Sequence, residues 1–478
     1  MLRLTWVQPE DLLGHELRQA AQDGRCPATV AAVAARWRAA GGPEAPDRAG
    51  ASATPVSRYL RTLAEDLLDE LAELPSPMAE AEPTDLGRIK GLCPDWPAAP
   101  AAGPQPSAAR LEAAWLGRAA GCLLGKPVEK LPLEGIRALA RATGDWPLTT
   151  FFTARGLPAE LAAAHPWNRR SAATSLAENI DGMPEDDDLN FPLLGLLLLR
   201  RHRRSFTTED VARLWLDELP AGRLFTAERV ACRNLLSGVE PPHTARHRNP
   251  FREWIGALIR ADVHGWTNPG DPGAAAEQAH RDAVLSHTGG GVHAAMFAAA
   301  VIAAAAGGGV DVHGCLRAGL AVVPPGSRLA RAVRHAVRLA REHAGGAAEF
   351  EPVVDALHTE HARYHWVHAV PNTALIAAAL THADGDFTGS VCRAVSGGWD
   401  TDSNGATAGS VAALLAGSPA ALPKRWTAPL KNRLATSVAG FDGVGFDTLG
   451  RTTAHLCAPD PRPERALPAR PVLEAATS

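Results

Sequence analysis

The chain has 478 residues, with 48 basic and 52 acidic side chains and a formal net charge of −4. A chain of this length exceeds one typical domain and can bury a large core. The near-even charge balance gives no bulk electrostatic reason to bind nucleic acid or an anionic membrane, so we expect neither partner. Alanine, leucine and arginine dominate and tyrosine occurs only twice, which predicts a mainly α-helical protein.

Three features of the sequence bear on cellular location. Residues 1–11 contain no apolar stretch typical of a secretory signal. The longest apolar run, 294–306, is mostly alanine and too short to span a bilayer, so we expect a buried helix there. The seven cysteines form no C-x-x-C pair, which argues against a disulfide framework or a structural zinc site. We therefore expect a cytoplasmic protein.

The N-terminal part of the chain is predicted to be a separate helical region. Apolar residues recur at helical spacing after Pro9, within 30–39 and within 56–74. No chemistry is evident there, so we interpret the region as a packing or docking appendage. The predicted organisation is an N-terminal helical region at 1–95, a Pro/Ala linker at 96–107, a helical domain at 108–457 and a proline-rich tail at 458–478.

The helical domain begins with glycines four residues apart, at Gly117, Gly121 and Gly125. This spacing lets another helix or a ligand approach the backbone closely. Pro127 is expected to end or kink the helix, so Glu129 would lie just past its end.

An acidic run, Glu185-Asp186-Asp187-Asp188, precedes a segment that is apolar nearly all round, which predicts a buried helix. Acids at a helix N-terminus can simply cap free N–H groups and complement the helix dipole. Capping needs only one or two acids, and four adjacent carboxylates repel one another unless a cation is present. Capping and cation binding both remain open for this run.

A second acidic cluster, Asp400 to Asn404, alternates two aspartates with Thr401 and Ser403 and is flanked by glycines. We expect a loop, because glycines free the backbone to turn. Carboxylates and hydroxyls are hard oxygen ligands that suit Mg²⁺, Mn²⁺ or Ca²⁺ rather than zinc. The two acidic clusters could together hold two ions about 4 Å apart, bridged by a shared carboxylate and a water.

Three further features have both a functional and an ordinary interpretation. The glycines at 289–291, after His287, could offer backbone N–H groups to a phosphate or could form a simple turn. Trp399 could stack on a base or a ribose, although packing explains it as well. A helix over 327–343 places four arginines on one face, which we interpret as solvated surface rather than a nucleic-acid site.

An Asp-rich run in an all-α protein is also typical of prenyl-diphosphate enzymes. Those enzymes need an Asp-x-x-Asp or similar spacing and a wide aromatic pocket. Here the acids are contiguous and aromatic residues make up 5% of the chain, so we give this reading little weight.

The motifs of the helical domain, taken in order, resemble those of the ADP-ribosylglycohydrolase family. The segment 117–129 is similar to the family's first glycine-rich motif, with Cys122 in place of an aspartate. The run 185–188 matches the family's TDDT motif, with both central aspartates kept and both flanking hydroxyls replaced by acids. The strongest match is 398–410, to the family's GGDtDt motif, and 286–291 resembles the loop that lines the diphosphate.

The resemblance implies an all-α orthogonal bundle with two Mg²⁺ ions, for which Mn²⁺ is an alternative. It implies a hydrolase that cleaves the N- or O-glycosidic bond between ADP-ribose and an acceptor, so that ADP-ribose or an ADP-ribosylated acceptor is the expected partner. The implied metal ligands are Glu185, Asp186, Asp187, Asp400, Asp402 and Ser403, the catalytic candidates are Glu129, Asp187 and Asp188, and the substrate-binding candidates are His287, Gly289, Gly290, Gly291 and Trp399.

Two alternatives stay open. Cys122 and the changed flanks of the TDDT motif also fit a non-catalytic relative that binds ADP-ribose or has a structural role. The same metal chemistry would equally serve a hydrolase that acts on another diphosphate or glycoside.

Overall fold

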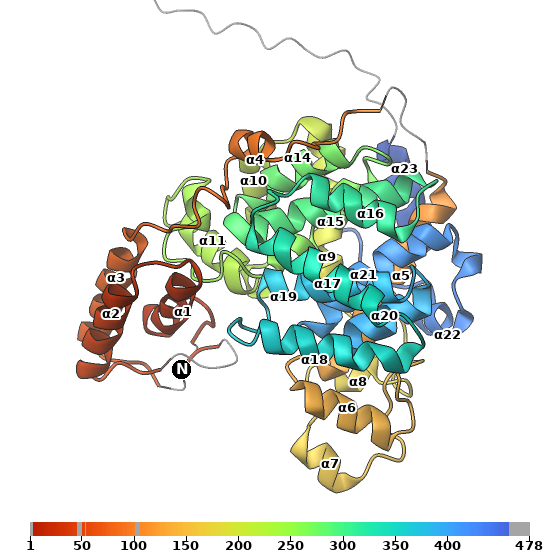
Figure 1. The fold of residues 1–478 in the computed structure, drawn as a ribbon, viewed down its shortest axis with the longest axis horizontal. Coiled ribbons are helices and arrows are strands. Elements are labelled where there is room, and N and C mark those ends of the chain that lie inside the picture. Colours follow the sequence, from red (N-terminus) through yellow and green to blue (C-terminus); the bar gives the residue numbers. More distant parts are fainter. Residues whose placement is uncertain (1–2, 45–49, 53, 101–105, 458–478) are drawn as a thin grey trace, which may run out of the picture.

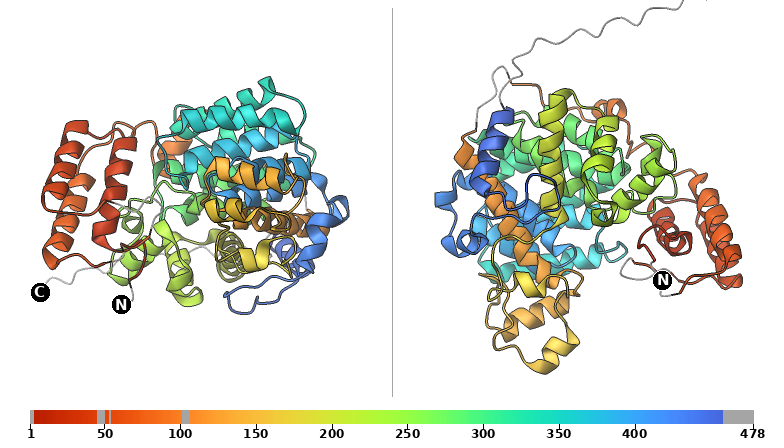
Figure 2. Two further views of the ribbon diagram at one scale, coloured as in Figure 1. Left: turned by 90° about the horizontal axis from the view of Figure 1, so that it is seen from below. Right: turned by 180° about the vertical axis from the view of Figure 1, so that it is seen from behind.

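The computed structural model describes residues 3–44, 50–52, 54–100 and 106–457, so the predicted tail lies outside the described residues. Within these ranges the chain forms 23 α-helices and no strand, which confirms the all-α prediction. Helices α4–α23 form the main body, and α1–α3 pack together at one side of it (Figures 1 and 2). The helices are α1 Pro9–Gln22, α2 Pro27–Ala39, α3 Arg58–Ala72, α4 Leu86–Leu92, α5 Ala108–Gly125, α6 Leu133–Ala142, α7 Ala159–Ala164, α8 Ala172–Ser175, α9 Asp187–His202, α10 Thr208–Glu218, α11 Thr226–Leu236, α12 Gly256–Ile259, α13 Asp262–Trp266, α14 Pro272–Ala283, α15 Gly289–Gly307, α16 Val312–Ala321, α17 Arg328–Glu342, α18 Phe350–Glu360, α19 Ala369–His382, α20 Phe387–Ser396, α21 Thr401–Ala416, α22 Lys424–Thr427 and α23 Phe446–Cys457.

Helices α5 and α21 pack against each other with their backbones in direct contact. A Cβ atom on Gly121 would lie 1.9 Å from the carbonyl oxygen of Gly405, and one on Gly117 would lie 2.3 Å from that of Gly409. Glycines four apart lie on one face of a helix, so each helix presents a smooth face to the other. The close approach that the sequence predicts at these glycines is therefore a helix–helix contact. It places the end of α5 beside the start of α21.

The cluster Asp400–Asn404 is not the loop that the sequence predicts, because it forms the start of α21. Asp400 is the N-cap residue, and the backbone is helical from Thr401 onward. The chain turns earlier, at Gly398 and Trp399, whose φ angles are +76° and +58°. The glycines after the cluster serve helix packing rather than a turn.

Two helices are buried nearly all round. The N-cap of α9 is Asp186, whose side chain accepts a hydrogen bond of 2.9 Å from the N–H of Asp188, so capping is confirmed for this acid. Every residue of α9 from Leu189 to Leu199 is buried. In the described part of the chain, α15 is the one helix long and apolar enough to cross a membrane, but 94% of its apolar window is buried inside the protein. It is therefore a core helix, as predicted.

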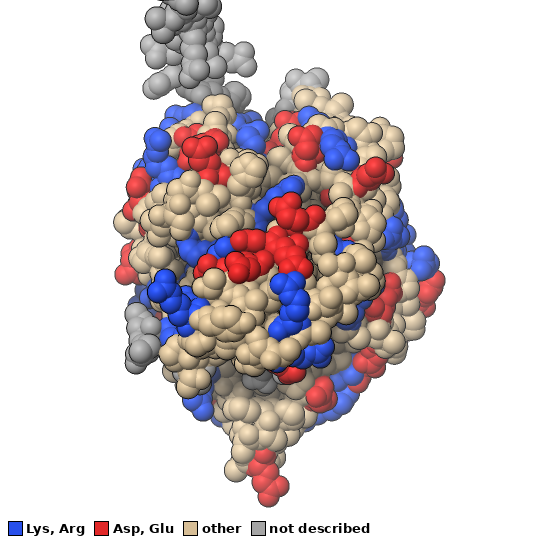
Figure 3. Space-filling view, turned by 90° about the vertical axis from the view of Figure 1, so that its left-hand side faces the viewer, with Lys and Arg blue, Asp and Glu red and all other residues tan. Residues whose placement is uncertain are grey.

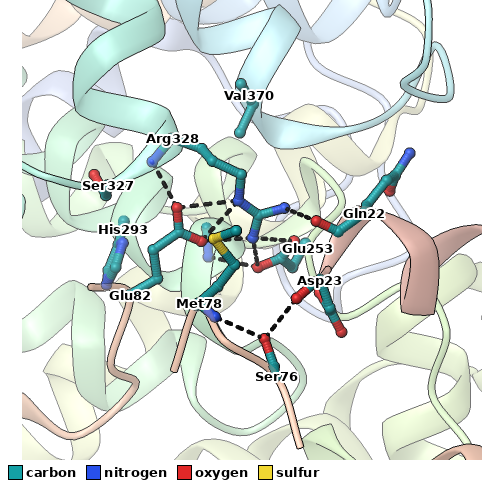
Figure 4. A network of polar contacts seen from close by, with 12 residues as sticks. Gln22, Asp23, Ser76, Met78, Glu82, Glu253, His293, Ser327, Arg328 and Val370 are labelled. Carbon is teal, nitrogen blue, oxygen red and sulfur yellow. Dashed lines mark hydrogen bonds and ion pairs between the residues drawn. The ribbon is translucent and has the colours of Figure 1, made fainter. Parts of the chain in front are cut away.

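The N-terminal region docks on the main body through buried ion pairs. Arg328, the first residue of α17, contacts both Glu82 and Glu253, with its Nε 2.8 Å from Glu82 Oε2 and its Nη2 2.9 Å from Glu253 Oε1 (Figure 4). Arg252 contacts Glu16 of α1 at 2.6 Å. Removing one partner of a buried pair leaves an uncompensated charge, so these pairs hold the region in one place on the main body.

On the outer side of the N-terminal region, where α2 and α3 lie, acidic side chains gather at the centre of the face and basic side chains border them (Figure 3). There Arg36 contacts Glu70 at 2.6 Å, and Arg248 contacts Asp69 at 2.7 Å. Exposed pairs of this kind contribute little to stability. The mixture of charges is typical of solvated surface rather than of a binding site for a charged polymer.

We expect Gly121→Ala to lower the free energy of unfolding by at least about 1–3 kcal/mol, because the added Cβ collides with the backbone of α21. Gly91→Ala is the matched control: Gly91 lies in α4, and no atom lies within 4 Å of its added Cβ. This control should leave stability unchanged or raise it by up to about 1 kcal/mol. Urea unfolding followed by circular dichroism measures both. Equal stability of the two variants would contradict the backbone contact.

Candidate active site

Acidic side chains from three distant segments meet at one cavity of about 970 Å³. One lies just past the 3-10 turn Lys126–Val128 that ends α5, and the others lie at the starts of α9 and α21. The structure thus brings together acids that are far apart in the sequence. The sequence-predicted residues that line this cavity are Glu129, Glu185, Asp186, Asp187, Asp400, Asp402 and Ser403.

Three carboxylates of the cavity form a group of oxygen ligands only. One oxygen atom each from Glu129, Asp400 and Asp402 lies within 4.8 Å of the other two. The side chain of Glu129 is held in place by Asn168, whose Nδ2 donates a hydrogen bond of 2.7 Å, and by Lys130 at 2.8 Å from its other oxygen. Because Mg²⁺ and Mn²⁺ prefer oxygen ligands, this group fits a hard divalent cation.

A second group joins Cys122 to Asp186 and Asp188, again with the ligand atoms within 4.8 Å of one another. This group differs from the first because it contains a thiol. A thiol is a soft ligand that suits metals other than Mg²⁺. A cation of the protein already lies in this group, since the Lys126 ammonium forms an ion pair with the Asp186 carboxylate. This group therefore does not fit a second Mg²⁺ ion.

Asp188 lies beneath the cavity rather than on its wall. Its two carboxylate oxygens accept hydrogen bonds from Arg118 Nη2 at 2.9 Å and from Ser403 Oγ at 3.2 Å. The buried Arg118 also contacts Asp262 at 2.9 Å, so the guanidinium serves two carboxylates at once. Of the aspartates predicted to be catalytic, Asp187 lines the cavity and Asp188 belongs to the support below it.

Glu185 is also occupied by neighbouring groups. One of its oxygens lies 3.0 Å from Arg223 Nη2. The other accepts hydrogen bonds from Asn190 Nδ2 at 3.1 Å and from the N–H of Ser437 at 2.9 Å. These contacts tie the segment before α9 to the C-terminal part of the domain.

Burial and mutual repulsion determine the protonation of the cavity acids. Burial first, and neighbouring carboxylates second, raise the pKa values of Asp187 and Asp400 well above their usual range and the pKa of Asp402 to about 7. Burial alone would also raise the pKa of Asp186, but the Lys126 ammonium lowers it. The cavity therefore holds carboxylates whose charged forms a bound cation would stabilise.

The structure does not bring the predicted glycine turn to the cavity. His287 is fully buried, and neither it nor the three glycines line the cavity wall. The N–H of Gly289 donates to Thr84 Oγ1 at 3.1 Å, and that of Gly290 donates to Glu253 at 3.0 Å. These donors are satisfied within the chain, and the N-terminal region lies against the turn. Its glycines begin the buried helix α15.

Trp399, the fifth predicted substrate-binding residue, also lies outside the cavity lining. Its ring stacks on that of His358, with 4.1 Å between the ring centroids and an angle of 9° between the planes. In the structure Trp399 therefore packs against a neighbouring side chain, as its ordinary interpretation predicts.

Some cavity residues are not predicted from the sequence. Thr5 and Trp6 line the cavity and come from the N-terminal region, in which no sequence feature indicates chemistry. Arg170 and Phe225 line it as well, from segments without a recognisable motif. Lys126 could have been found from the sequence, because it lies inside the first glycine-rich motif, and a lysine close to acidic clusters can indicate an ion pair within the site.

The chain is similar to known proteins over most of its length. A family model described as ADP-ribosylglycohydrolase matches residues 104–451, which is more than half of the chain. One solved structure, described as an ADP-ribosylglycohydrolase-related protein complex, is similar at 19% sequence identity and a TM-score of 0.45, covering 73% of this chain and 97% of that chain. No curated protein sequence matches the chain. The N-terminal region lies outside the family match.

The raised pKa of Asp402 predicts a specific pH dependence of stability. The folded protein keeps a proton on Asp402 up to about pH 7, whereas the unfolded chain releases it near the ordinary value of 3.8. The associated stability is therefore present below about pH 4 and is lost as the pH rises through 7. In metal-free buffer with chelator, Asp402→Asn should show a smaller fall in Tm between pH 5 and pH 8 than the unsubstituted protein.

The matched control is Asp66→Asn, at an exposed position of α3, which should keep the full fall in Tm. Thermal unfolding at the two pH values measures all three proteins. A fall in Asp402→Asn as large as in the unsubstituted protein would contradict the assignment.

Proposed function

The chain belongs to the ADP-ribosylglycohydrolase family, and we propose that it is a hydrolase that cleaves the N- or O-glycosidic bond between ADP-ribose and an acceptor. The observation that supports this proposal most is the group of Glu129, Asp400 and Asp402 on the wall of a cavity of about 970 Å³. A pocket of this size accommodates a ligand as large as ADP-ribose. Carboxylates at its wall supply the acid–base chemistry that glycosidic cleavage needs.

We place the divalent cation, Mg²⁺ with Mn²⁺ as the alternative, at Glu129, Asp400 and Asp402. A bound ion would supply a Lewis acid for ribose hydroxyls and for a water molecule. Among the chain's own residues, Asn168 and Lys130 fix the orientation of Glu129 on the cavity wall. Glu129 is therefore our candidate for the group that moves a proton to or from the attacking water.

Asp187 is suited to a different task. It lines the cavity, and burial together with the neighbouring carboxylates raises its pKa well above the usual range. A carboxyl group with a raised pKa holds its proton to higher pH and is better suited to donate it to a departing acceptor. Asp188 positions the site from below through Arg118 and Ser403 and does not touch the cavity.

Basic side chains on the cavity wall favour an anionic substrate. Lys130, Arg169 and Arg170 line the same cavity as the acids. Guanidinium groups bind phosphate oxygens with strong, charge-assisted hydrogen bonds. A substrate with a diphosphate and a ribose matches a wall on which cations and carboxylates lie close together.

We also propose a cytoplasmic location. All seven cysteines are free thiols, and six of them are buried. Unpaired thiols are typical of proteins kept in reducing surroundings.

The direct test is release of ADP-ribose from N-linked arginine and O-linked serine conjugates in Mg²⁺, measured by chromatography and mass spectrometry. We expect turnover of at least one conjugate. Asp400→Ala and Asp402→Ala should each reduce the rate by more than about 100-fold, because each removes a ligand of the cation. Asp384→Ala, at an exposed position, should keep the full rate.

Turnover of no conjugate, or full activity in both ligand variants, would contradict the proposal. Calorimetry with ADP-ribose separates the remaining outcomes. Binding without turnover of any conjugate would favour the non-catalytic alternative.

A further inference from the structure

We infer that this protein binds one divalent cation rather than two, and that the ammonium group of Lys126 occupies the place of the second. The inference rests on the cation dependence proposed above and specifies how the charge of that site is balanced. It departs from the two-ion site that the sequence motifs imply.

The two groups of candidate ligands differ in what already contacts them. In the group of Cys122, Asp186 and Asp188, every acid is engaged: Lys126 Nζ forms an ion pair with Asp186, and Arg118 contacts Asp188 at 2.9 Å. Both basic side chains are buried, with 10% of Lys126 and none of Arg118 exposed. A second divalent ion would have to lie against two buried positive charges.

The backbone also fixes Lys126 in this position. It begins the 3-10 turn that ends α5, and Gly125 before it is pressed against the backbone of Asp402 in α21. Its Nζ lies 3.4 Å from the backbone carbonyl oxygen of Glu185, in addition to the ion pair with Asp186. The ammonium thus bridges the segment before α9 to the end of α5, as a metal ion would.

The group of Glu129, Asp400 and Asp402 has a different environment. Its one direct ion pair among the described residues is between Glu129 Oε1 and Lys130, whose side chain is 40% exposed and also lies over the Trp366 ring at 5.8 Å from the centroid. The two aspartates form no ion pair with a basic side chain in the described part of the chain. Three oxygen ligands with this little compensation are where a hard divalent cation gains most.

The other side chains of the second group point the same way. Cys122 is a neutral thiol rather than a carboxylate, and Lys126 adds a positive charge four residues later. Both residues keep the negative charge of this group low. The Lys126 ammonium therefore takes the place of one of the two cations of the site.

The number of bound ions tests the inference directly. We would strip the full chain with chelator, titrate it with Mn²⁺ by calorimetry, and count Mn²⁺ after dialysis by mass spectrometry. We expect one ion per chain in the unsubstituted protein and a second, weaker one in Lys126→Ala, which frees the Asp186 carboxylate. Two ions in the unsubstituted protein, or one in both proteins, would overturn the inference.

Two matched aspartate variants locate the ion. Asp402→Asn should weaken Mn²⁺ binding by more than about 10-fold, whereas Asp186→Asn should change it by less than about threefold. Thermal unfolding verifies that each variant folds, and the ion count of the unsubstituted protein decides the question if one does not. Strong loss in Asp186→Asn would overturn the inference. A chain that binds one Mn²⁺ at Asp402 but releases no ADP-ribose would overturn only the proposed function.

A separate observation concerns the N-terminal region: we propose that Trp6 forms a wall of the substrate site and stacks on a planar aromatic part of the substrate. Thr5 and Trp6 line the cavity that contains the acids, although they lie outside the family match. Arg229 holds this segment, with a hydrogen bond of 2.8 Å to Thr5 Oγ1 and its guanidinium 4.9 Å from the Trp6 ring. Phe225 meets the same ring edge-on at 5.5 Å.

Calorimetry with two ligands tests this role, which rests on the proposed function. Trp6→Ala should bind ADP-ribose roughly 10-fold more weakly, whereas Trp6→Phe should retain most of the affinity. Ribose 5-phosphate has no aromatic ring, so its affinity should be the same with and without Trp6. Tyr59→Ala, at an exposed position of α3, is the control for the region.

Equal affinity of Trp6→Ala and the unsubstituted protein for ADP-ribose would overturn the role of Trp6. An equal loss for both ligands would also overturn it, because the effect would then not come from the aromatic ring. If the unsubstituted protein binds neither ligand, the proposed function fails together with this role.

Discussion

The backbone contact between α5 and α21 determines where the acids of the site can lie. Four glycines, Gly117, Gly121, Gly405 and Gly409, allow two helices to approach until a single added carbon atom would collide with the other backbone. At the end of this contact, Thr401 Oγ1 donates a hydrogen bond of 2.8 Å to the carbonyl oxygen of Gly125. The start of α21 and the end of α5 are therefore fixed relative to each other, and the carboxylates that follow α5 and begin α21 face one cavity.

This proximity has an electrostatic cost that the protein meets in two ways. On one side of the site, Lys126 and Arg118 compensate Asp186 and Asp188 with buried positive charges. On the other side, the carboxylates have raised pKa values, because burial and mutual repulsion disfavour their charged forms. The site is thus asymmetric: the charges of one half are compensated within the chain, whereas the other half would gain stability from a bound cation. The two halves differ because of where the basic side chains lie, and not because of how many acids each half contains.

The parts of the fold that depend on local pattern could be predicted from the sequence. Helical periodicity predicts α1 and α3, the apolar run predicts the buried α15, and the spacing of Gly117 and Gly121 predicts a close backbone approach. The convergence of the two acidic clusters is predicted only through the hypothesis of a shared cation, because carboxylates brought together without one repel each other. What could not be predicted depends on tertiary contacts. The glycines after Asp402 pack a helix instead of making a turn, and the donors of Gly289 and Gly290 are already bound by Thr84 and Glu253.

Tertiary contacts also change how the N-terminal region is interpreted. Sequence periodicity shows only helices there, yet Glu82 and Glu16 of this region enter buried ion pairs with Arg328 and Arg252 of the main body. Glu253 lies in the middle of this network, since it contacts Arg328 and also accepts the hydrogen bond from the N–H of Gly290. The region that covers the glycine turn is therefore the region that places Trp6 at the cavity. A segment outside the family match thus contributes Thr5 and Trp6 to the wall of the cavity that contains the acids.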